Sequence, residues 1–300
     1  MVPGFPVAQN SAPTLVWNGS SYAVACVAED TGDTHYMVYF LLLDPLSGNV
    51  TKKVKVSFVS MTEAVDCFVS PSVAFSGNGY AVAWSDSRNG NWDVFATLLD
   101  ASGNISYHDI TVCNATNNQD SPVAAWSQGQ GAYVVAWEDY RSGKSEIYDV
   151  ELLTGGTTTG DWRIATGTGD SLLPSLTDTG DGLGIVWNDS RDGNDEIYFA
   201  RLRQNGDKLS TSDLNVSSNS SVSLYPVIVW TGAEYGVFWY DEQGGNYDLW
   251  FQRVSASGAS MGSNMQVTIS NGMYDPRAAF AQYGYLVAGA AQSAANFIVP

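Results

Sequence analysis

Hydrophobic and polar positions along the chain alternate in short runs, and one such pattern recurs. It begins with a proline followed four residues later by an aromatic residue, and its copies are PTLVW, PSVAF, PVAAW, PVIVW and PRAAF, starting at Pro13, Pro71, Pro122, Pro226 and Pro276. A sixth copy, PSLTD from Pro174, keeps the proline and lacks the aromatic. Because these prolines lie 50 to 58 residues apart, the pattern predicts six repeated units.

Each unit continues with further short apolar runs separated by glycine- or asparagine-rich turns. A second run extends from tyrosine to tryptophan in its best copies, YAVAW (80–84) and YVVAW (133–137). A third run is typified by EIYFARLR (196–203) and a fourth by DITVC (109–113). Side chains on a strand alternate between two faces, and large residues on both faces indicate that both are covered. Four antiparallel strands in each of six units predict a β-propeller.

The predicted fold is therefore all-β, a single six-bladed propeller domain over residues 1–300. Its four-stranded antiparallel blades are expected at about 11–60, 68–115, 120–168, 172–218, 224–271 and 274–300. The last unit lacks a fourth strand, and residues 4–10 resemble one. We expect this N-terminal strand to complete the sixth blade and to close the ring, which would remove an exposed sheet edge.

The turn between the second and third strands carries a shared motif, D-x-R-x-G-x-x-[DE]. Its copies begin at Asp86, Asp139, Asp189 and Asp241, with Gln243 in place of arginine in the last. Glycine supplies the positive φ of a tight turn, and the first aspartate can accept backbone N–H groups. Arginine can bridge the acids at both strand ends as a bidentate donor. A structural clasp accounts for four equivalent copies better than four active sites do.

The copy at 189–196 is the richest in acids and invites comparison with a calcium loop. An EF-hand loop needs oxygen ligands at positions 1, 3 and 5 and glycine at position 6. Here Arg191 stands at position 3 and Gly193 at position 5, so the match fails. Asp192 and Asp195 have no counterparts in the other copies, and any function special to the fourth unit is expected at these two acids.

The stretch SRDGNDEIY (190–198) resembles the repeat of TolB-type and related exported bacterial propellers. The likeness follows the period of all six units and is close in sequence for four of them. Those families carry a Pro-Asp-Gly turn between the first two strands, whereas this chain has SGNG (76–79) at that place. The resemblance implies an envelope or secreted propeller that works by binding a protein.

Turns between the second and third strands share one rim of a propeller with the connections between blades. Four acids and three aromatic residues of these segments are the candidate ligand contacts: Asp66, Trp92, Asp120, Asp170, Tyr225, Tyr274 and Asp275. Aromatic rings beside carboxylates suit the recognition of sugars or peptides. The carboxylates could instead ring a Ca²⁺ ion, or each could cap the turn that enters its blade. Uneven spacing between the acids and the repeat prolines favours capping.

Composition narrows the partners and the compartment. Thirteen basic and 31 acidic residues give a formal charge of −18, which opposes binding to nucleic acid or to an anionic membrane. No apolar run approaches the roughly 18 residues of a membrane span. Cys26, Cys67 and Cys113 match no zinc-binding spacing and permit at most one disulfide. Scarce lysine with abundant Asn, Ser, Thr and Gly favours an extracellular or periplasmic protein, with a signal segment expected upstream of Met1.

Little in the sequence indicates catalysis. The two histidines, His35 and His108, fall in different units, and no catalytic serine or metalloprotease motif occurs, so no catalytic residue is assigned. We predict a monomeric, non-enzymatic binding or scaffold propeller that recognises a protein or a glycan on the rim, and Ca²⁺ is the one cofactor that the sequence suggests. Two alternatives stay open, a glycan hydrolase or lyase using two rim carboxylates and a calcium-dependent adhesin.

Overall fold

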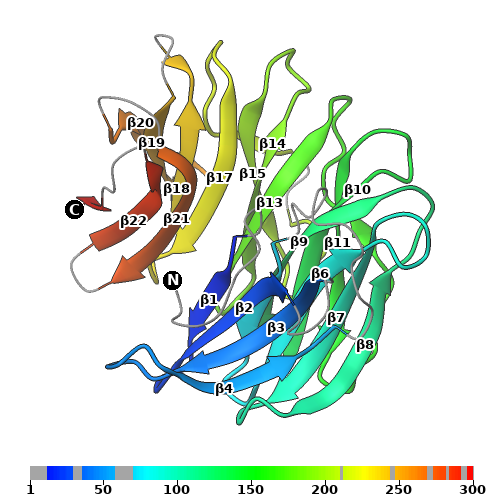
Figure 1. Cartoon of the computed structure of the whole chain (residues 1–300). Coiled ribbons are helices and arrows are strands. Elements are labelled where there is room, and N and C mark those ends of the chain that lie inside the picture. The colour runs from blue at the N-terminus through cyan, green and yellow to red at the C-terminus, as the bar shows by residue number, and fades with distance from the viewer. Residues whose placement is uncertain are drawn as a thin grey trace. The chain divides into compact units, whose positions relative to one another are not determined.

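The computed structural model describes residues 12–29, 36–57, 70–209, 212–243, 247–268, 273–281, 284–291 and 296–299. These residues form antiparallel sheets, five with four strands and one with three, and contain no α-helix (Figure 1). Two compact units divide the chain: residues 1–143 with 148–162, and residues 144–147 with 163–300.

The first unit holds the first two sheets and most of the third. The first sheet consists of β1 (Thr14–Trp17), β2 (Tyr22–Glu29), β3 (Tyr36–Leu43) and β4 (Val50–Lys55). The second consists of β5 (Ser72–Phe75), β6 (Gly79–Asp86), β7 (Asp93–Asp100) and β8 (Ile105–Cys113). The third consists of β9 (Gln119–Ser127), β10 (Ala132–Asp139), β11 (Glu146–Leu153) and β12 (Trp162–Arg163). The boundary between the units passes through β11 and β12.

The second unit holds the remaining three sheets. The fourth sheet consists of β13 (Ser171–Asp178), β14 (Leu183–Asp189), β15 (Glu196–Leu202) and β16 (Leu214–Asn215). The fifth consists of β17 (Ser223–Trp230), β18 (Glu234–Asp241), β19 (Asp248–Ser255) and β20 (Ser260–Gln266). The sixth consists of β21 (Met273–Ala281), β22 (Gly284–Ala291) and β23 (Asn296–Val299).

The prediction of four-stranded antiparallel units is confirmed for five sheets, and four of the six sheets begin one residue before the range predicted for their unit. The three-stranded sixth sheet matches the expectation that this unit contains no fourth strand of its own. Residues 4–10, the strand predicted to complete it, lie outside the described residues. The closed ring, the number of blades in it and the single domain stay predictions.

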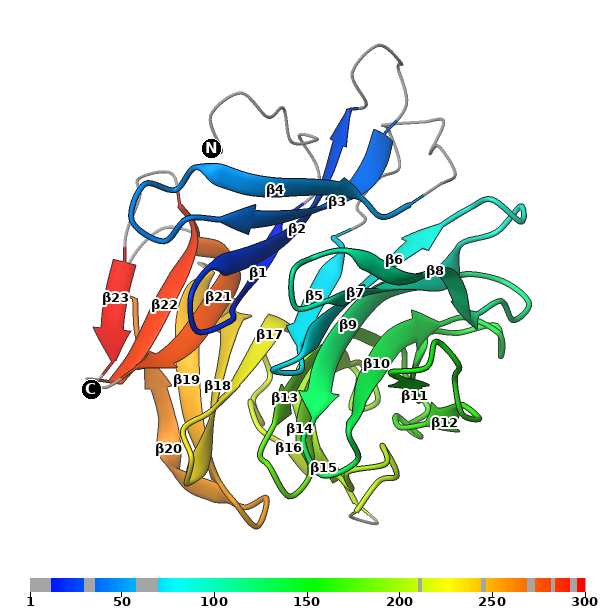
Figure 2. The same cartoon turned by 90° about the horizontal axis from the view of Figure 1, so that it is seen from below.

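The core lies between neighbouring sheets, because both faces of the second strands are covered. All residues of β6, β10 and β14 are buried. In the first unit, the first two sheets lie side by side (Figure 2). Phe40 of the first sheet and Trp84 of the second belong to one hydrophobic cluster. In the second unit, Phe199 of the fourth sheet and Trp239 of the fifth belong to the corresponding hydrophobic cluster.

The aromatic residues of the repeat form one cross-strand pair per hairpin. The repeat's aromatic at the end of the first strand faces the tyrosine that opens the second, with ring centroids 4.7 to 5.2 Å apart. The pairs are Trp17–Tyr22, Phe75–Tyr80, Trp126–Tyr133, Trp230–Tyr235 and Phe280–Tyr285. Such pairs stabilise a sheet by about 0.5–1.5 kcal/mol beyond their buried area. The fourth sheet lacks the pair, since Asp178 there faces Leu183.

Candidate functional site

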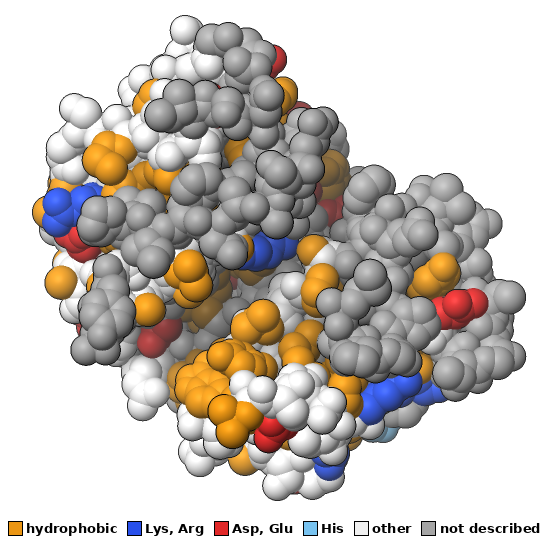
Figure 3. All heavy atoms as spheres, turned by 60° about the vertical axis from the view of Figure 1, so that its left-hand side comes forward, with side chains coloured by type: hydrophobic (Ala, Val, Ile, Leu, Met, Phe, Trp, Pro, Cys, Tyr) orange, Lys and Arg blue, Asp and Glu red, His pale blue; other side chains and the backbone are white. Residues whose placement is uncertain are grey.

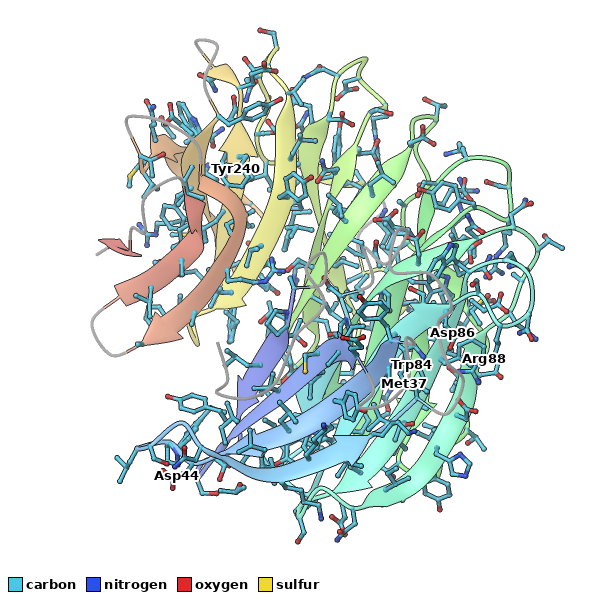
Figure 4. All side chains as sticks on the ribbon, viewed as in Figure 1. Met37, Asp44, Trp84, Asp86, Arg88 and Tyr240 are labelled. Carbon is cyan, nitrogen blue, oxygen red and sulfur yellow. The ribbon has the colours of Figure 1, made fainter. Side chains whose placement is uncertain are left out.

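The D-x-R-x-G turn of the second sheet forms a network of hydrogen bonds around Asp86, which lies close to Trp84 and Arg88 (Figure 4). Trp84 Nε1 donates to Asp86 Oδ2 at 3.0 Å. Arg88 Nε and Nη2 donate to the two oxygens of Asp86 at 2.8 and 2.5 Å, and Arg88 Nη1 donates to Asp109 Oδ1 at 2.7 Å. The guanidinium carbon lies 3.8 Å from the centroid of the Phe95 ring. These five residues define the clasp of this sheet.

The third and fourth sheets repeat the clasp. Arg141 binds Asp139 and Asp161 and lies over Tyr148, and Arg191 binds Asp189 and Asp213 and lies over Tyr198. The first aspartates are buried, at 0–2% exposure. Carboxylates that are desolvated and bidentately paired in this way hold the fold together, so the structural interpretation of the motif is the better one.

One expectation about the clasp was wrong. The arginine does not bridge the acids at the two ends of its own turn, because its guanidinium group turns over the ring of the third strand and reaches an aspartate at the fourth. The acid that opens the third strand is bound by other groups. Glu196, for example, accepts hydrogen bonds from Asn194 Nδ2 at 3.0 Å and from the Ser217 hydroxyl group.

Asp189 shows what the clasp does electrostatically. Burial raises the pKa of this carboxyl group, but hydrogen bonds from Arg191, Trp187 and Ser171 outweigh burial and hold the pKa below its ordinary value. Asp192 is also engaged, since it accepts hydrogen bonds from the Tyr198 hydroxyl group and from Asn215. Of the acids special to the fourth unit, Asp195 is therefore the one left for chemistry.

The predicted shared rim is present within each unit. In the third sheet, Asp120 of β9 pairs with Glu138 of β10, and Tyr140 N of the following turn donates to Asn118 O at 2.9 Å. In the fourth sheet, Ser190 N of the turn donates to Asp170 O at 3.0 Å. In these two sheets, the connection that enters the sheet thus lies beside the turn that joins its second strand to its third.

On the rim of the first unit, Asp120 and Glu138 are in direct contact. Burial raises the pKa of Asp120, and hydrogen bonds with Ser121 and Glu138 only partly oppose this. The Tyr140 hydroxyl group donates to Glu138 Oε2 at 3.3 Å. Two carboxyl groups that touch favour a shared proton. A glycosidase needs its two carboxyl groups about 5 to 9.5 Å apart, so this pair does not have the geometry of a hydrolase.

On the rim of the second unit, the structure places Asp170, Asp195 and Tyr225 on adjoining segments. Burial raises the pKa of Asp195, and the negative charges of Asp170 and Asp189 raise it further. Asp170 Oδ1 accepts a hydrogen bond from Ser145 N at 3.0 Å. Asp195 O accepts one from Ser223 N at 2.8 Å, two residues before Tyr225. Asp170 and Tyr225 of the sequence-predicted set thus lie on segments that adjoin the segment of Asp195.

Tyr225 occupies an uncommon backbone conformation. Its φ is +54°, and its side chain is 42% exposed with the ring edge-on to that of Tyr240, 6.3 Å between centroids. Ser121 and Leu173 precede the repeat proline in the same way, with φ of +52° and +53°. This left-handed conformation is unfavourable for bulky residues, and it accompanies a break in strand register. The repeat explains the bulge, but it does not explain a tyrosine in it.

The other predicted site residues fall elsewhere. Trp92 is half-buried and packs against the hydrophobic cluster that contains Trp84 and Phe95. Asp66 lies outside the described residues. Tyr274 and Asp275 lie in β21, whose description does not extend to their side chains.

Sequence reasoning missed Glu138 and the three fourth-strand aspartates, Asp109, Asp161 and Asp213. A recurring Asp that begins DITV, DWRI and DLNV was the available signal for the aspartates. Glu138 had a signal as well, since the residue between Trp and Asp is Ser, Asn or Tyr in the other copies of the motif.

The described residues offer little support for metal or redox chemistry. No group of three or more His, Cys, Asp or Glu side chains among them could hold a metal ion, and the Ca²⁺ site stays a prediction. Cys26 and Cys113 are free thiols, and burial raises the pKa of each to about 11, which makes them unreactive. Cys67 and His35 lie outside the described residues. No helix in the described part of the chain is long and apolar enough to cross a membrane.

The surface contains patches of hydrophobic side chains. On the face shown in Figure 3 these patches are separated by polar surface, and Lys and Arg side chains lie in small separate groups. An extended basic surface, the usual footprint of a nucleic-acid-binding protein, is not seen on this face.

No protein-family model matches the chain, and no curated protein sequence matches it. Among solved structures, a thermostable family-43 glycoside hydrolase is similar with a TM-score of 0.50 and 12% identity, over 91% of this chain and 97% of that one. A prolyl endopeptidase is similar with a TM-score of 0.52 and 13% identity, over 98% of this chain and 42% of that one. TolB from Acinetobacter baumannii has a TM-score of 0.45 and 16% identity, over 85% of this chain and 54% of that one.

The chain thus spans about half of the TolB chain and less than half of the prolyl endopeptidase chain. Likeness at these identities concerns the fold alone. Together with the succession of four-stranded antiparallel sheets, it shows that the chain has an all-β propeller fold.

Proposed function

We propose that the protein is a glycan-binding β-propeller that acts outside the cytoplasm, with its ligand on the rim at Asp170, Asp195 and Tyr225. The observation that carries the proposal is the conformation of Tyr225. The repeat sets the left-handed backbone before the proline, since Ser121 and Leu173 share it, but of these three positions only Tyr225 places an aromatic ring there, at φ +54° and 42% exposed, in a conformation that costs a bulky residue free energy. Such costs are concentrated at binding sites, where a side chain must point in a set direction.

The chemistry of the three side chains suits a sugar. An aromatic ring stacks on the apolar face of a pyranose or furanose, and carboxylates accept hydrogen bonds from its hydroxyl groups. The net charge of −18 disfavours an anionic ligand. A neutral glycan is therefore favoured over an acidic one. The extracellular or periplasmic location is supported by the composition and by the TolB-like repeat.

A glycan array followed by titration of the strongest neutral oligosaccharide tests this proposal. Tyr225→Ala is expected to weaken binding about tenfold or more, and Tyr225→Phe to retain it, because stacking needs only the ring. Phe280→Ala is a matched control, since Phe280 lies in the same unit and is exposed to a similar extent, 43%. Binding that is absent in the wild type, or unchanged by Tyr225→Ala, would contradict the proposal.

A second candidate function is glycoside hydrolysis at the same place. The specific observation is Asp195, whose pKa is raised by burial and by the charge of Asp170. A carboxyl group whose pKa is raised, with a second carboxyl group near it, is the arrangement that glycosidases use for general acid and base. The family-43 glycoside hydrolase of similar fold is an enzyme of this class.

Release of reducing sugar from a panel of neutral polysaccharides distinguishes the two functions. An enzyme would lose turnover in Asp195→Asn and Asp170→Asn while still binding the substrate. Its activity would fall as pH rises through the raised pKa of Asp195. Binding without any turnover would exclude the hydrolase and leave the binding function intact.

A further inference from the structure

A second surface, unrelated to the rim, is hollowed between the outer strand of the second sheet and the turn that follows β11. This groove has a volume of about 730 Å³ and belongs entirely to the first unit. Its polar and aromatic lining comes from Ser106, Tyr107, His108, Thr111, Thr157 and Thr158. A volume of this size admits a ligand as large as a short oligosaccharide.

The strand that forms one wall departs from the other outer strands. β8 is nine residues long, whereas β4 has six residues, β20 has seven, and β12 and β16 have two each (Figure 2). Three breaks in register with β7 bend it, and Ser106, Tyr107 and His108 are exposed one after another. Bulges of this kind change the direction in which side chains point, and they are common beside binding sites. The repeat accounts for none of these three side chains.

The opposite wall fixes the position of the Tyr107 ring. A Cβ atom on Gly156 would lie 2.7 Å from Tyr107 Cγ and Cδ1, so the ring lies directly on the glycine backbone. Gly156 has φ +79°, and its turn is held by Gly156 N donating to Leu153 O at 2.9 Å and Leu153 N donating to Thr157 O at 2.8 Å. The ring is thus backed by the turn, and 45% of Tyr107 stays exposed.

From this geometry we infer that the groove is a binding site for a neutral oligosaccharide. The Tyr107 ring provides the stacking surface, and the hydroxyl groups of Ser106, Thr111, Thr157 and Thr158 with the His108 imidazole provide directional hydrogen bonds. A platform braced by backbone loses little side-chain entropy when a ligand binds. The site is independent of the rim, and the protein would be bivalent if the rim also binds glycan.

The test uses the whole chain and neutral oligosaccharides of arabinose, xylose, mannose and glucose, followed by calorimetry and by nitration of Tyr107 with mass spectrometry. A bound sugar should protect Tyr107 from nitration. Tyr107→Ala should weaken binding about tenfold or more. Trp17→Ala, at an aromatic of the same unit with 46% exposure, should leave it unchanged.

Two further variants keep the outcomes distinct. Gly156→Val pushes the ring aside without removing it and should also weaken binding, provided that the melting temperature shows a folded protein. Tyr225→Ala alters the rim alone and should leave protection of Tyr107 intact. Loss of all binding in Tyr225→Ala, with no effect of Tyr107→Ala, would overturn the groove and support the rim. Failure of every oligosaccharide to protect Tyr107, or binding of a protein strand along β8 instead, would also overturn the inference.

Discussion

The clasps of the fourth and fifth sheets share a centre and differ in their surroundings. In both, a buried aspartate accepts the indole N–H of the tryptophan two residues earlier, Trp187 to Asp189 at 2.8 Å and Trp239 to Asp241 at 3.1 Å. In the fourth sheet the aspartate also binds a guanidinium group. In the fifth, Asp241 instead accepts hydrogen bonds from neutral groups, among them Asn219 Nδ2 at 2.7 Å.

The two differences between these sheets occur together. Gln243 replaces the arginine, and Asn264 occupies the register position of the fourth-strand aspartate, Asp213. A charge left without its partner in a partly buried site is costly, whereas two neutral groups are not. The arginine and the fourth-strand aspartate therefore act as a unit, and the bond between tryptophan and aspartate is the part that both sheets keep.

The first sheet, by contrast, lacks the tryptophan–aspartate centre. Cys26 and Ala28 occupy the places of the tryptophan and the aspartate, and Lys53 occupies the place of the fourth-strand aspartate. Lys53 Nζ nevertheless lies 4.5 Å from the centroid of the Tyr39 ring. A cation over the third-strand ring is thus retained, although it comes from a different strand.

The largest expected difference between the two sheets follows from removing the central aspartate. Asp189→Ala leaves Arg191 without its main partner and should lower the free energy of unfolding by about 3–5 kcal/mol. Asp241→Ala leaves only neutral donors and should cost about 1–3 kcal/mol. Urea unfolding of both variants measures the difference. Equal losses would show that the ion pair adds nothing to the centre.

Removing the arginine should have an intermediate effect. Arg191→Gln should cost about 1.5–3 kcal/mol, because hydrogen bonds to two charged groups are lost. Adding Asp213→Asn reproduces the combination of the fifth sheet and should cost less than the sum of the single changes, by at least about 0.5 kcal/mol. Arg191→Lys is the control for charge without the bidentate geometry. Strict additivity in the unfolding cycle would contradict the view that the two residues act as a unit.

Dependence on pH separates the clasp from the Asp120–Glu138 pair. The pKa of Asp120 is raised on folding, so its contribution to stability is present below the ordinary value of 3.8 and is lost as pH rises through the raised value. The pKa of Asp189 is lowered, so its contribution is present above 3.8 and is lost as pH falls through the lowered value. Asp120→Asn should therefore gain melting temperature relative to the wild type as pH rises from 4 towards 8.

Melting curves across that pH range provide the measurement. The deficit of Asp189→Ala should instead stay constant over the same range and shrink only below it. If the melting temperatures of Asp120→Asn and the wild type changed in parallel with pH, the contact between Asp120 and Glu138 would not involve a shared proton.

The smallest effect is expected from placing an arginine in the fifth sheet. Gln243→Arg provides the guanidinium group but no fourth-strand carboxylate to receive it, so stability should change by no more than about 0.5 kcal/mol. Comparison with Arg191→Gln, by the same urea titration, shows which carboxylate accounts for the arginine's contribution to the free energy of unfolding. A gain in stability as large as the loss in Arg191→Gln would show that the first aspartate of the motif alone accounts for that contribution.

Much of the fold could be predicted because the repeat depends on residues that are close together in the sequence. The aromatic of PTLVW or PVIVW faces its tyrosine across a tight hairpin, and both residues of such a pair lie within about ten residues of each other. The number of strands in each unit follows from the same turns. The partner of Arg191 could not be found in this way, because Asp213 lies 22 residues further along and only the register of the fourth strand brings it near.

The sequence indicated where the candidate site residues lie along the strands, but not which side chains contact one another there. Sequence order alone places Asp170 and Tyr225 at the starts of inner strands, on one rim. It does not show that Asp120 touches Glu138, nor that Trp92 turns into the core.

By itself, the sequence determined the repeat, the antiparallel hairpins and the buried tyrosine–tryptophan strands, because each depends on residues close together in the chain. Only the tertiary structure decided which acids are paired with other groups of the protein. Arg191 forms ion pairs with Asp189 and Asp213. Asp192 accepts hydrogen bonds from Tyr198 and Asn215, whereas Asp195 lies at the rim. The pairing of each acid depends on contacts between strands that are far apart in the sequence. Those contacts depend on strand register and burial rather than on spacing along the chain.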